Sequence, residues 1–119
     1  MSSILVQTDN ISAANLAGQY IVDNSNTGMV LICGGGEGNL GSEDRRDGVK
    51  EIVENAGYTV IYKICNWDYS IAYETTKTEL TNNPDIKAIF CANDNMALAA
   101  LQAVKEKGLF GQVLIFGFD

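Results

Sequence analysis

The sequence predicts a three-layer αβα sandwich with a mainly parallel, doubly wound sheet. Short apolar runs alternate along the chain with segments whose apolar residues recur at helical spacing. The central runs are almost continuous in Val, Ile and Leu, as expected for strands that are covered on both faces. The connections are short, which favours right-handed β–α–β crossovers.

The predicted elements follow in order along a single domain, without repeat or linker. The predicted strands cover residues 4–7, 29–33, 59–64, 86–91 and 113–116. The first helix has a stripe of Ala13, Leu16, Ala17, Tyr20 and Ile21, and the second has Val49, Ile52, Val53 and Ala56, with Gly57 as its stop. A third helix covers about residues 69–81 and ends at Asn82-Asn83-Pro84. The fourth carries Met96, Ala99, Ala100, Ala103 and Val104, with Gly108 just after its end.

Composition excludes several classes of function. The net charge of −7, the pI of about 4.4 and the lack of any basic run argue against nucleic-acid binding. No stretch is long and apolar enough for a membrane span, and the start, Met1-Ser2-Ser3-Ile4, has no signal-peptide pattern. Cys33, Cys65 and Cys91 lie in or after strands without metal-ligand spacing, and the chain has no histidine. We therefore expect free, buried thiols and no metal.

A glycine-rich loop raises the question of a nucleotide cofactor. Gly36, Gly38 and Gly41 satisfy G-x-G-x-x-G between a strand and a helix. The acidic residue that should follow at the end of the next strand is missing, and Glu37 and Glu43 would repel a pyrophosphate. The glycines fit close backbone approach equally well. No cofactor is expected, and no nucleophile–base pair indicates catalysis.

Polar and aromatic side chains follow the strands at the edge where ligands bind in parallel sheets. Arg45 is placed in the first turn of a helix capped by Ser42, and it fits either a solvated ion-pair cluster or a fork aimed at ligand oxygens. Trp67, in a strand–helix connection, suits a platform for the C–H face of a sugar, although most lone tryptophans belong to the core. Asp68 and Asp94 are interpreted as helix N-caps, which leaves Asn93 free to face the cleft. Asp119 ends the chain after the last strand.

The order of several motifs resembles one known family. DN at Asp9-Asn10, R-x-D-G from Arg45, NWD around Trp67, the run from Asn83 to Val104 with its AxND, and the final GFD are similar to sugar-binding periplasmic proteins of bacterial ABC transporters. The ribose- and galactose-binding type is the most similar. The resemblance covers essentially the whole chain and corresponds to most of the C-terminal lobe.

The resemblance implies roles for individual residues. Arg45 and Asn93 would hydrogen-bond sugar hydroxyls, Asp119 would bind two hydroxyls, and Trp67 would stack on the ring. Asp9 and Asn10 would lie at the first hinge crossing between two lobes. The ligand would be a pentose or hexose, the parent's partner an ABC permease, and the parent's location the periplasm or a membrane-anchored lipoprotein.

The resemblance also implies that residues 1–119 hold only part of a clamp, without the N-terminal lobe and without the final helix and strand. We therefore expect weak sugar binding and self-association of the isolated lobe. Effector domains of lac-repressor-type regulators carry the same motifs, although they typically have a proline where this chain has Gly108-Leu109-Phe110-Gly111. Chemotaxis or sensor-kinase receptors also use the same lobe. A nucleotide-dependent enzyme remains the alternative outside the binding proteins, because of the glycine-rich loop.

Overall fold

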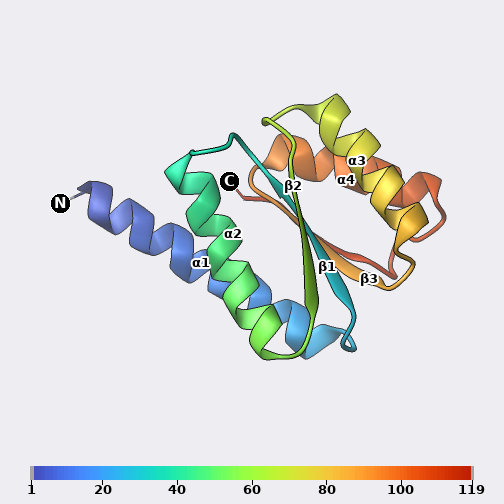
Figure 1. The fold of residues 1–119 in the computed structure, drawn as a ribbon, viewed down its shortest axis with the longest axis horizontal. Helices are drawn as coiled ribbons and strands as arrows, with labels where there is room; N and C mark the ends of the chain where they lie inside the picture. The colour runs from blue at the N-terminus through green and yellow to red at the C-terminus, as the bar shows by residue number, and fades with distance from the viewer. Residues whose placement is uncertain (1, 119) are drawn as a thin grey trace.

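The computed structural model describes residues 2–118, with side chains described from residue 10 onward. A parallel four-stranded sheet lies between two pairs of helices, which confirms the predicted fold class (Figure 1). The strands are β1 (Met29–Gly34), β2 (Thr59–Ile64), β3 (Ile86–Cys91) and β4 (Leu114–Phe116), in the order β2-β1-β3-β4. The helices are α1 (Ser2–Asn24), α2 (Leu40–Asn55), α3 (Tyr69–Asn82) and α4 (Asp94–Glu106).

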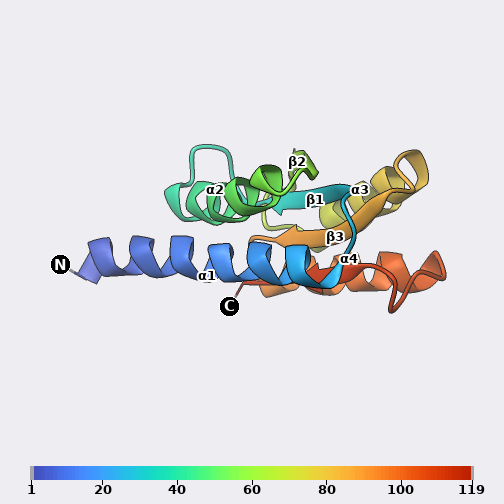
Figure 2. The same ribbon diagram turned by 90° about the horizontal axis from the view of Figure 1, so that it is seen from below.

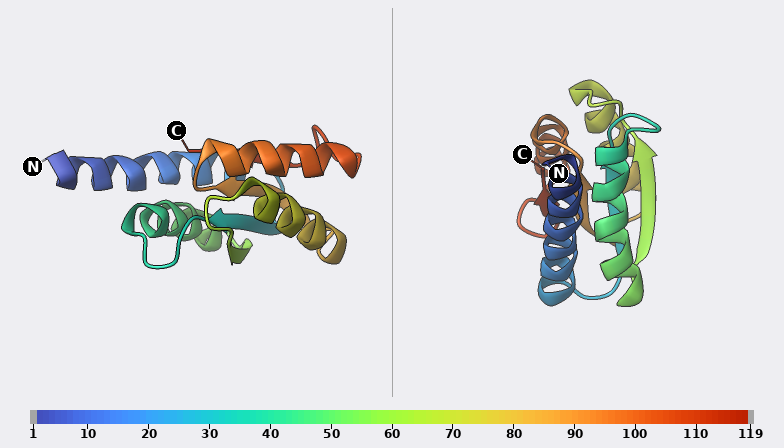
Figure 3. Two further views of the ribbon diagram at one scale, coloured as in Figure 1. Left: turned by 90° about the horizontal axis from the view of Figure 1, so that it is seen from above. Right: turned by 90° about the vertical axis from the view of Figure 1, so that its left-hand side faces the viewer.

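The two helix pairs cover opposite faces of the sheet. Helices α1 and α2 pack together on one face, and α3 and α4 pack together on the other. Figures 2 and 3 show that α1 and α4 lie toward the β4 edge, whereas α2 and α3 lie toward the β2 edge. One face of the sheet presents Val30, Ile32 and Phe90 to the first pair, while Leu31 and Ile89 face the second. Strands buried on both faces account for their near-continuous apolar sequence.

The predicted helix ends are confirmed where glycine was expected to stop the helix. Gly57 and Gly108 have φ angles of 94° and 73°, which only glycine adopts readily. At the end of α4, the Leu109 N–H donates to the Val104 carbonyl at 3.0 Å, satisfying an otherwise unpaired carbonyl of the last turn. The chain therefore turns sharply from α4 toward β4.

The prediction of a strand at residues 4–7 is wrong, because these residues belong to α1. An extended segment satisfies its backbone groups only beside another strand, and residues 4–7 pair with none of the described strands. A helix satisfies those groups within the segment itself, so the helix that begins in the predicted stripe of Ala13 to Ile21 extends toward the N-terminus.

Close backbone approach fixes α2 against α1. A Cβ on Gly48 would lie 2.6 Å from Ala14 Cβ, which is too near for any larger residue. The Asn15 amide donates to the Gly48 carbonyl at 2.6 Å across the same contact. This packing sets the position of α2, which carries Arg45.

The three cysteines are free and buried, as predicted. They gather at the carboxyl ends of neighbouring strands, where Cys33 is in register with Cys91 and Cys65 directly follows β2. Contact with the Cys33 thiol, together with burial, raises the pKa of Cys65. The Cys65 thiol is therefore a protonated packing group.

Within the described part of the chain, no helix has the length and apolar character needed to cross a bilayer.

Candidate functional site

The loops that leave the strands meet at the carboxyl edge of the sheet. The Cys65 N–H donates to the Gly34 carbonyl at 2.8 Å, which joins the loops after β2 and β1. The Ala92 N–H donates to the Cys33 carbonyl at 3.0 Å, which joins the loop after β3 to the same place. Three loops are thereby fixed side by side, which is the arrangement in which α/β sheets bind ligands.

Arg45 extends from α2 over this edge. Its Nη1 donates to the Ala92 carbonyl at 2.6 Å, and its guanidinium carbon lies 4.1 Å from the centre of the Phe118 ring. Its Nε is buried and has no hydrogen-bond partner among the described residues. Burial lowers the pKa of Arg45 from its ordinary value, although the group stays charged. A buried, unpaired donor on a fixed cation is suited to a ligand oxygen.

The predicted cap of this helix is wrong. Asn39, not Ser42, caps α2, and its Oδ1 accepts from the Ser42 N–H at 2.9 Å. Ser42 is buried, and its hydroxyl accepts from the Gly35 N–H at 2.8 Å. The helix begins at Leu40, so Arg45 lies in its second turn, farther from the positive end of the helix dipole than predicted. The earlier start reduces the electrostatic penalty on Arg45.

Trp67 is half-buried and packs at the border of the core on the α3/α4 side. Its indole ring lies directly against Gly35 in the loop after β1. Asp68 caps α3 as predicted, with its Oδ1 accepting from the Ile71 N–H at 2.9 Å. Trp67 is thus at the same edge of the sheet as the loop that Arg45 contacts.

The prediction that Asp94 caps α4 is wrong, because Asn93 is the N-cap. The Oδ1 of Asn93 accepts from the Met96 N–H at 3.0 Å, which occupies that oxygen. Asn93 was predicted to be free, but its oxygen is occupied by the cap, and its amide nitrogen is the atom left for a ligand. Both residues are good caps, and the extended backbone at Asn93, with φ of −147°, decides which one caps here.

The remaining predicted site residues lie at the chain ends. Asp119 lies outside the described residues. Asp9 and Asn10 both lie in α1, where Asn10 is buried, and their place at a hinge stays a prediction.

The glycine-rich loop is arranged unfavourably for a phosphate group. The Gly38 N–H donates to Oε2 of Glu43 at 3.2 Å, so a carboxylate takes the place at which a phosphate oxygen would accept. No group of metal-ligating side chains occurs within the described residues.

Sequence reasoning missed three residues that shape this edge. Phe118 supports the Arg45 guanidinium, Gly35 supports the Trp67 indole, and Asn95 donates to the Trp67 carbonyl at 3.2 Å. The available signal was weak. Gly35 was one glycine in a run, and Asn95 stood in an exposed helical position.

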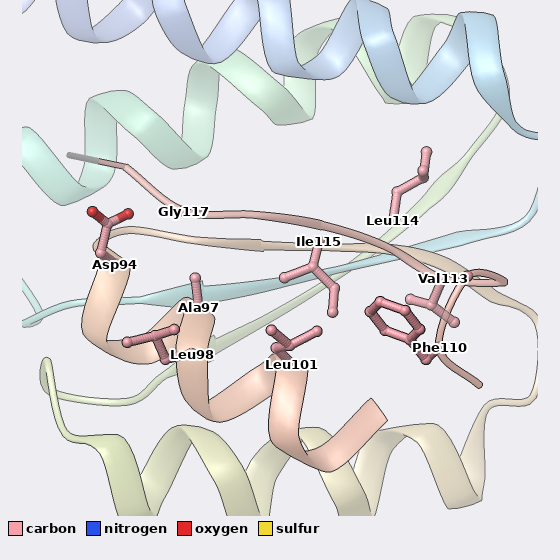
Figure 4. Close-up of a pocket in the computed structure, with 10 residues that line it drawn as sticks. Asp94, Ala97, Leu98, Leu101, Phe110, Val113, Leu114, Ile115 and Gly117 are labelled. Carbon is pink, nitrogen blue, oxygen red and sulfur yellow. The ribbon is translucent and has the colours of Figure 1, made fainter. Parts of the chain in front are cut away.

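A second feature is an apolar groove along α4, which neither Arg45 nor Trp67 lines. It has a volume of about 500 Å³ and lies between α4 and β4 (Figure 4). Leu98, Leu101, Phe110 and Ile115 line it, and Asp94 is its charged residue at one end. Its apolar lining does not suit a polyol.

Comparison with known proteins supplies the family. A family model described as "Periplasmic binding protein domain" matches residues 2–119. This chain belongs to that family. The D-allose-binding periplasmic protein of Escherichia coli is 37% identical over 118 residues, which are 96% of this chain and 38% of that protein. The ribose operon repressor of Halalkalibacterium halodurans is 29% identical over 97% of this chain and 35% of that protein.

A solved structure agrees with the family assignment. The periplasmic solute-binding protein of an ABC transporter from Actinobacillus succinogenes, solved with bound D-allose, matches with a TM-score of 0.86 and 33% identity. The match covers 93% of this chain and 40% of that one. The chain thus spans about two fifths of the length of these relatives. The family is one of solute-binding proteins rather than enzymes.

Proposed function

We propose that this chain is the sugar-binding lobe of a solute-binding protein of an ABC transporter, and that it contributes half of a hinged monosaccharide site. The observation that carries this proposal is the Arg45 guanidinium, which is fixed by Ala92 and Phe118 while its buried Nε lacks a partner among the described residues. Trp67 and the amide nitrogen of Asn93 belong to the same proposed site, and Asp119 is assigned to it by its GFD motif.

This set of side chains suits a sugar. Arginine and asparagine donate to hydroxyl oxygens, and an indole covers the C–H face of a pyranose or furanose ring. D-allose and D-ribose are the first sugars to test, because relatives are named for them. The complete clamp of the parent protein would bind at about micromolar or tighter, whereas half of the contacts leave about millimolar affinity.

Titration of the single tryptophan's fluorescence with D-allose tests this proposal. We expect a saturable change with a midpoint of about 1 mM or weaker. Arg45→Met should weaken binding about tenfold or more, since hydrogen bonds to charged groups contribute about 1.5–3 kcal/mol. Arg46→Met is the matched control, because Arg46 pairs with Asp47 at 2.8 Å instead of reaching Ala92. Equal effects of the two substitutions would contradict the assigned site, and micromolar binding by a monomer would show that the chain forms a complete site alone.

Two competing functions have tests of their own. The relationship to a ribose operon repressor keeps an effector-binding domain of a transcriptional regulator in consideration. A helix-turn-helix in the parent reading frame would support it, whereas a signal peptide with a lipobox cysteine would support transport. NAD in the same fluorescence titration tests a nucleotide-binding enzyme, which the contact between Glu43 and Gly38 disfavours.

The proposed parent protein acts outside the cytoplasm and delivers its sugar to an ABC permease, as expected for periplasmic binding proteins. In that protein, the segment at Asp9 and Asn10 would cross between the two lobes, and the remaining part of the site would come from the N-terminal lobe.

We further propose that the isolated chain self-associates along β4. This strand ends the sheet order and, among the described residues, pairs only with β3, so its outer backbone groups are open to another strand. The adjoining groove is flanked by Leu98 and Phe110, which are 60% and 65% exposed. Charge is nearly absent from this groove, so the net charge of −7 lies mostly elsewhere and is screened over about 8 Å.

Sedimentation at tens of micromolar protein tests this arrangement. We expect a dimer, and Phe110→Lys should shift it to monomer by placing a charge in the groove. A wild-type monomer with a cooperative melt would overturn the proposal.

A further inference from the structure

The loop between β2 and α3 has an unusual backbone. Asn66 and Trp67 have φ angles of 54° and 59°, so two successive residues with side chains lie in the left-handed region. Asparagine tolerates this conformation, but a bulky residue such as tryptophan rarely adopts it. Such a conformation persists only where surrounding contacts fix it.

The contacts that fix this loop come from two directions. On the strand side, the Asn66 N–H donates to the Gly35 carbonyl at 3.1 Å, while the Gly35 N–H is bound by the buried Ser42 hydroxyl. On the helix side, the Asn95 amide donates to the Trp67 carbonyl at 3.2 Å. Asn95 lies in the first turn of α4, immediately after the Asn93 cap and Asp94. The backbone of Trp67 is thereby held between the β1 loop and α4.

The indole ring has a specific seat. A Cβ on Gly35 would overlap the ring atoms Cζ2, Cε2 and Cη2, so the absence of a side chain at this position lets the ring lie on the backbone. A Cβ on Gly36 would meet the indole Nε1 at 3.6 Å, which is an ordinary van der Waals distance. Neither glycine has a positive φ angle, so the two positions differ chiefly in the space that the indole leaves.

We propose that Gly35 and Asn95 are positioning residues for Trp67, holding its indole in one orientation before the sugar arrives. This inference rests on the proposed sugar site. A ring that is already oriented does not have to be ordered on binding, so the entropy cost of binding is smaller and the affinity is higher. The plane of the ring also determines which face of the sugar stacks on it. Neither positioning residue needs to touch the ligand.

The first test uses protein without sugar, so it does not depend on binding. Gly35→Ala is compared with Gly36→Ala by near-ultraviolet circular dichroism and by acrylamide quenching of the single tryptophan. We expect Gly35→Ala to weaken the indole dichroism and to raise the quenching constant about twofold or more. Gly36→Ala should resemble the wild type. Identical spectra for Gly35→Ala and the wild type would overturn the role of Gly35.

The second test substitutes Asn95, which is exposed, so this variant should fold even if Gly35→Ala does not. Asn95→Asp removes the donor to Trp67 while placing a negative charge in the first turn of a helix, where it is favourable. We expect a change in the ligand-free tryptophan spectra with an unchanged urea midpoint, and three- to tenfold weaker binding of D-allose. Asn24→Asp is the control for the tryptophan spectra and for binding, because it breaks a bond of the same kind, from Asn24 to the Tyr20 carbonyl, in an exposed position outside the proposed site. Its urea midpoint is not compared, since its charge lies at the C-terminal end of α1, where the helix dipole disfavours it.

The two proposals fail in different ways. If D-allose leaves the wild-type spectra unchanged, the proposed function fails, while the ligand-free spectra of the variants still decide whether Trp67 is positioned. If Asn95→Asp gives wild-type ligand-free spectra, the role of Asn95 is overturned whether or not the sugar binds. If the spectra change but affinity does not, positioning of the ring does not serve binding and the inference fails at that step.

Discussion

Asn93 has two roles that substitutions can distinguish: its oxygen caps α4, and its amide nitrogen is proposed to donate to a sugar. Its Oδ1 accepts from the Met96 N–H at 3.0 Å, and Met96 is fully buried, so water has little access to replace this bond. Asn93→Ala therefore removes the cap of α4, and we expect the free energy of unfolding to fall by about 1 kcal/mol. For a chain of this size, the loss corresponds to a decrease of about 4 °C in Tm. Asn93→Ser keeps a capping oxygen and should stay within about 0.5 kcal/mol of the wild type.

Sugar binding should respond differently from stability. Alanine has no donor, and the shorter serine side chain, whose oxygen accepts at the cap, cannot place its hydroxyl proton where the Asn93 amide nitrogen lies. Both should weaken D-allose binding by about 0.5–1.5 kcal/mol, the usual net contribution of one hydrogen bond. Urea unfolding followed by far-ultraviolet circular dichroism measures the first effect, and tryptophan fluorescence titration measures the second.

The pair of variants can refute each role separately. If Asn93→Ser destabilises the fold as much as Asn93→Ala, the cap does not depend on the side-chain oxygen. If both variants bind D-allose as the wild type does, the amide nitrogen does not contact the sugar. Asp68→Ala is the control for capping, since it removes the corresponding bond to the Ile71 N–H at the start of α3.

Two further predictions concern packing and pH. Gly48→Ala should lower the free energy of unfolding, measured by urea unfolding, by about 1–3 kcal/mol, because the added methyl group would lie 2.6 Å from Ala14 Cβ. Gly41→Ala is the control and should be neutral or stabilising, because the nearest contact of its added methyl group would be 3.5 Å away. Because the pKa of Cys65 is raised in the folded state, the folded protein keeps a proton that the unfolded chain releases above about pH 8.5, the ordinary cysteine pKa. Stability should therefore fall as the pH rises above that value, and a Cys65→Ala variant with the same slope would contradict this.

The parallel sheet was predictable because most of its strands are short, nearly continuous apolar runs, which indicate strands covered on both faces. Runs such as residues 88–91, Ala-Ile-Phe-Cys, have no charged or strongly polar residue to turn toward water, so they fit strands covered on both sides. The gathering of Arg45, Trp67 and the residues after β3 at one edge follows from the common direction of parallel strands. Glycine stops at Gly57 and Gly108 were readable because few residue types besides glycine adopt their backbone angles.

Details that depend on competition between similar residues were not predictable. Asn93 and Asp94 are adjacent and are equally good caps, and Asn39 competes with Ser42 in the same way. Residues 4–7 have strand composition but continue the helix that follows them, which their local pattern does not show. The contact between the Trp67 indole and Gly35 depends on the paths of two loops that are far apart in sequence.

Residues 92–95, at the end of β3 and the start of α4, support each predicted ligand-binding side chain that the structure describes. The Ala92 carbonyl accepts from Arg45, which reaches this segment from α2 on one face of the sheet. Asn95 donates to the backbone of Trp67, which reaches it from the loop before α3 on the other face. Asn93, between them, caps the helix that holds both contacts in place. Because the same turn contacts Arg45 and Trp67 and contains Asn93, loss of the cap should alter the positions of Arg45 and Trp67 together. The effects on sugar affinity of substituting Arg45, Trp67 and Asn93 should therefore not be additive.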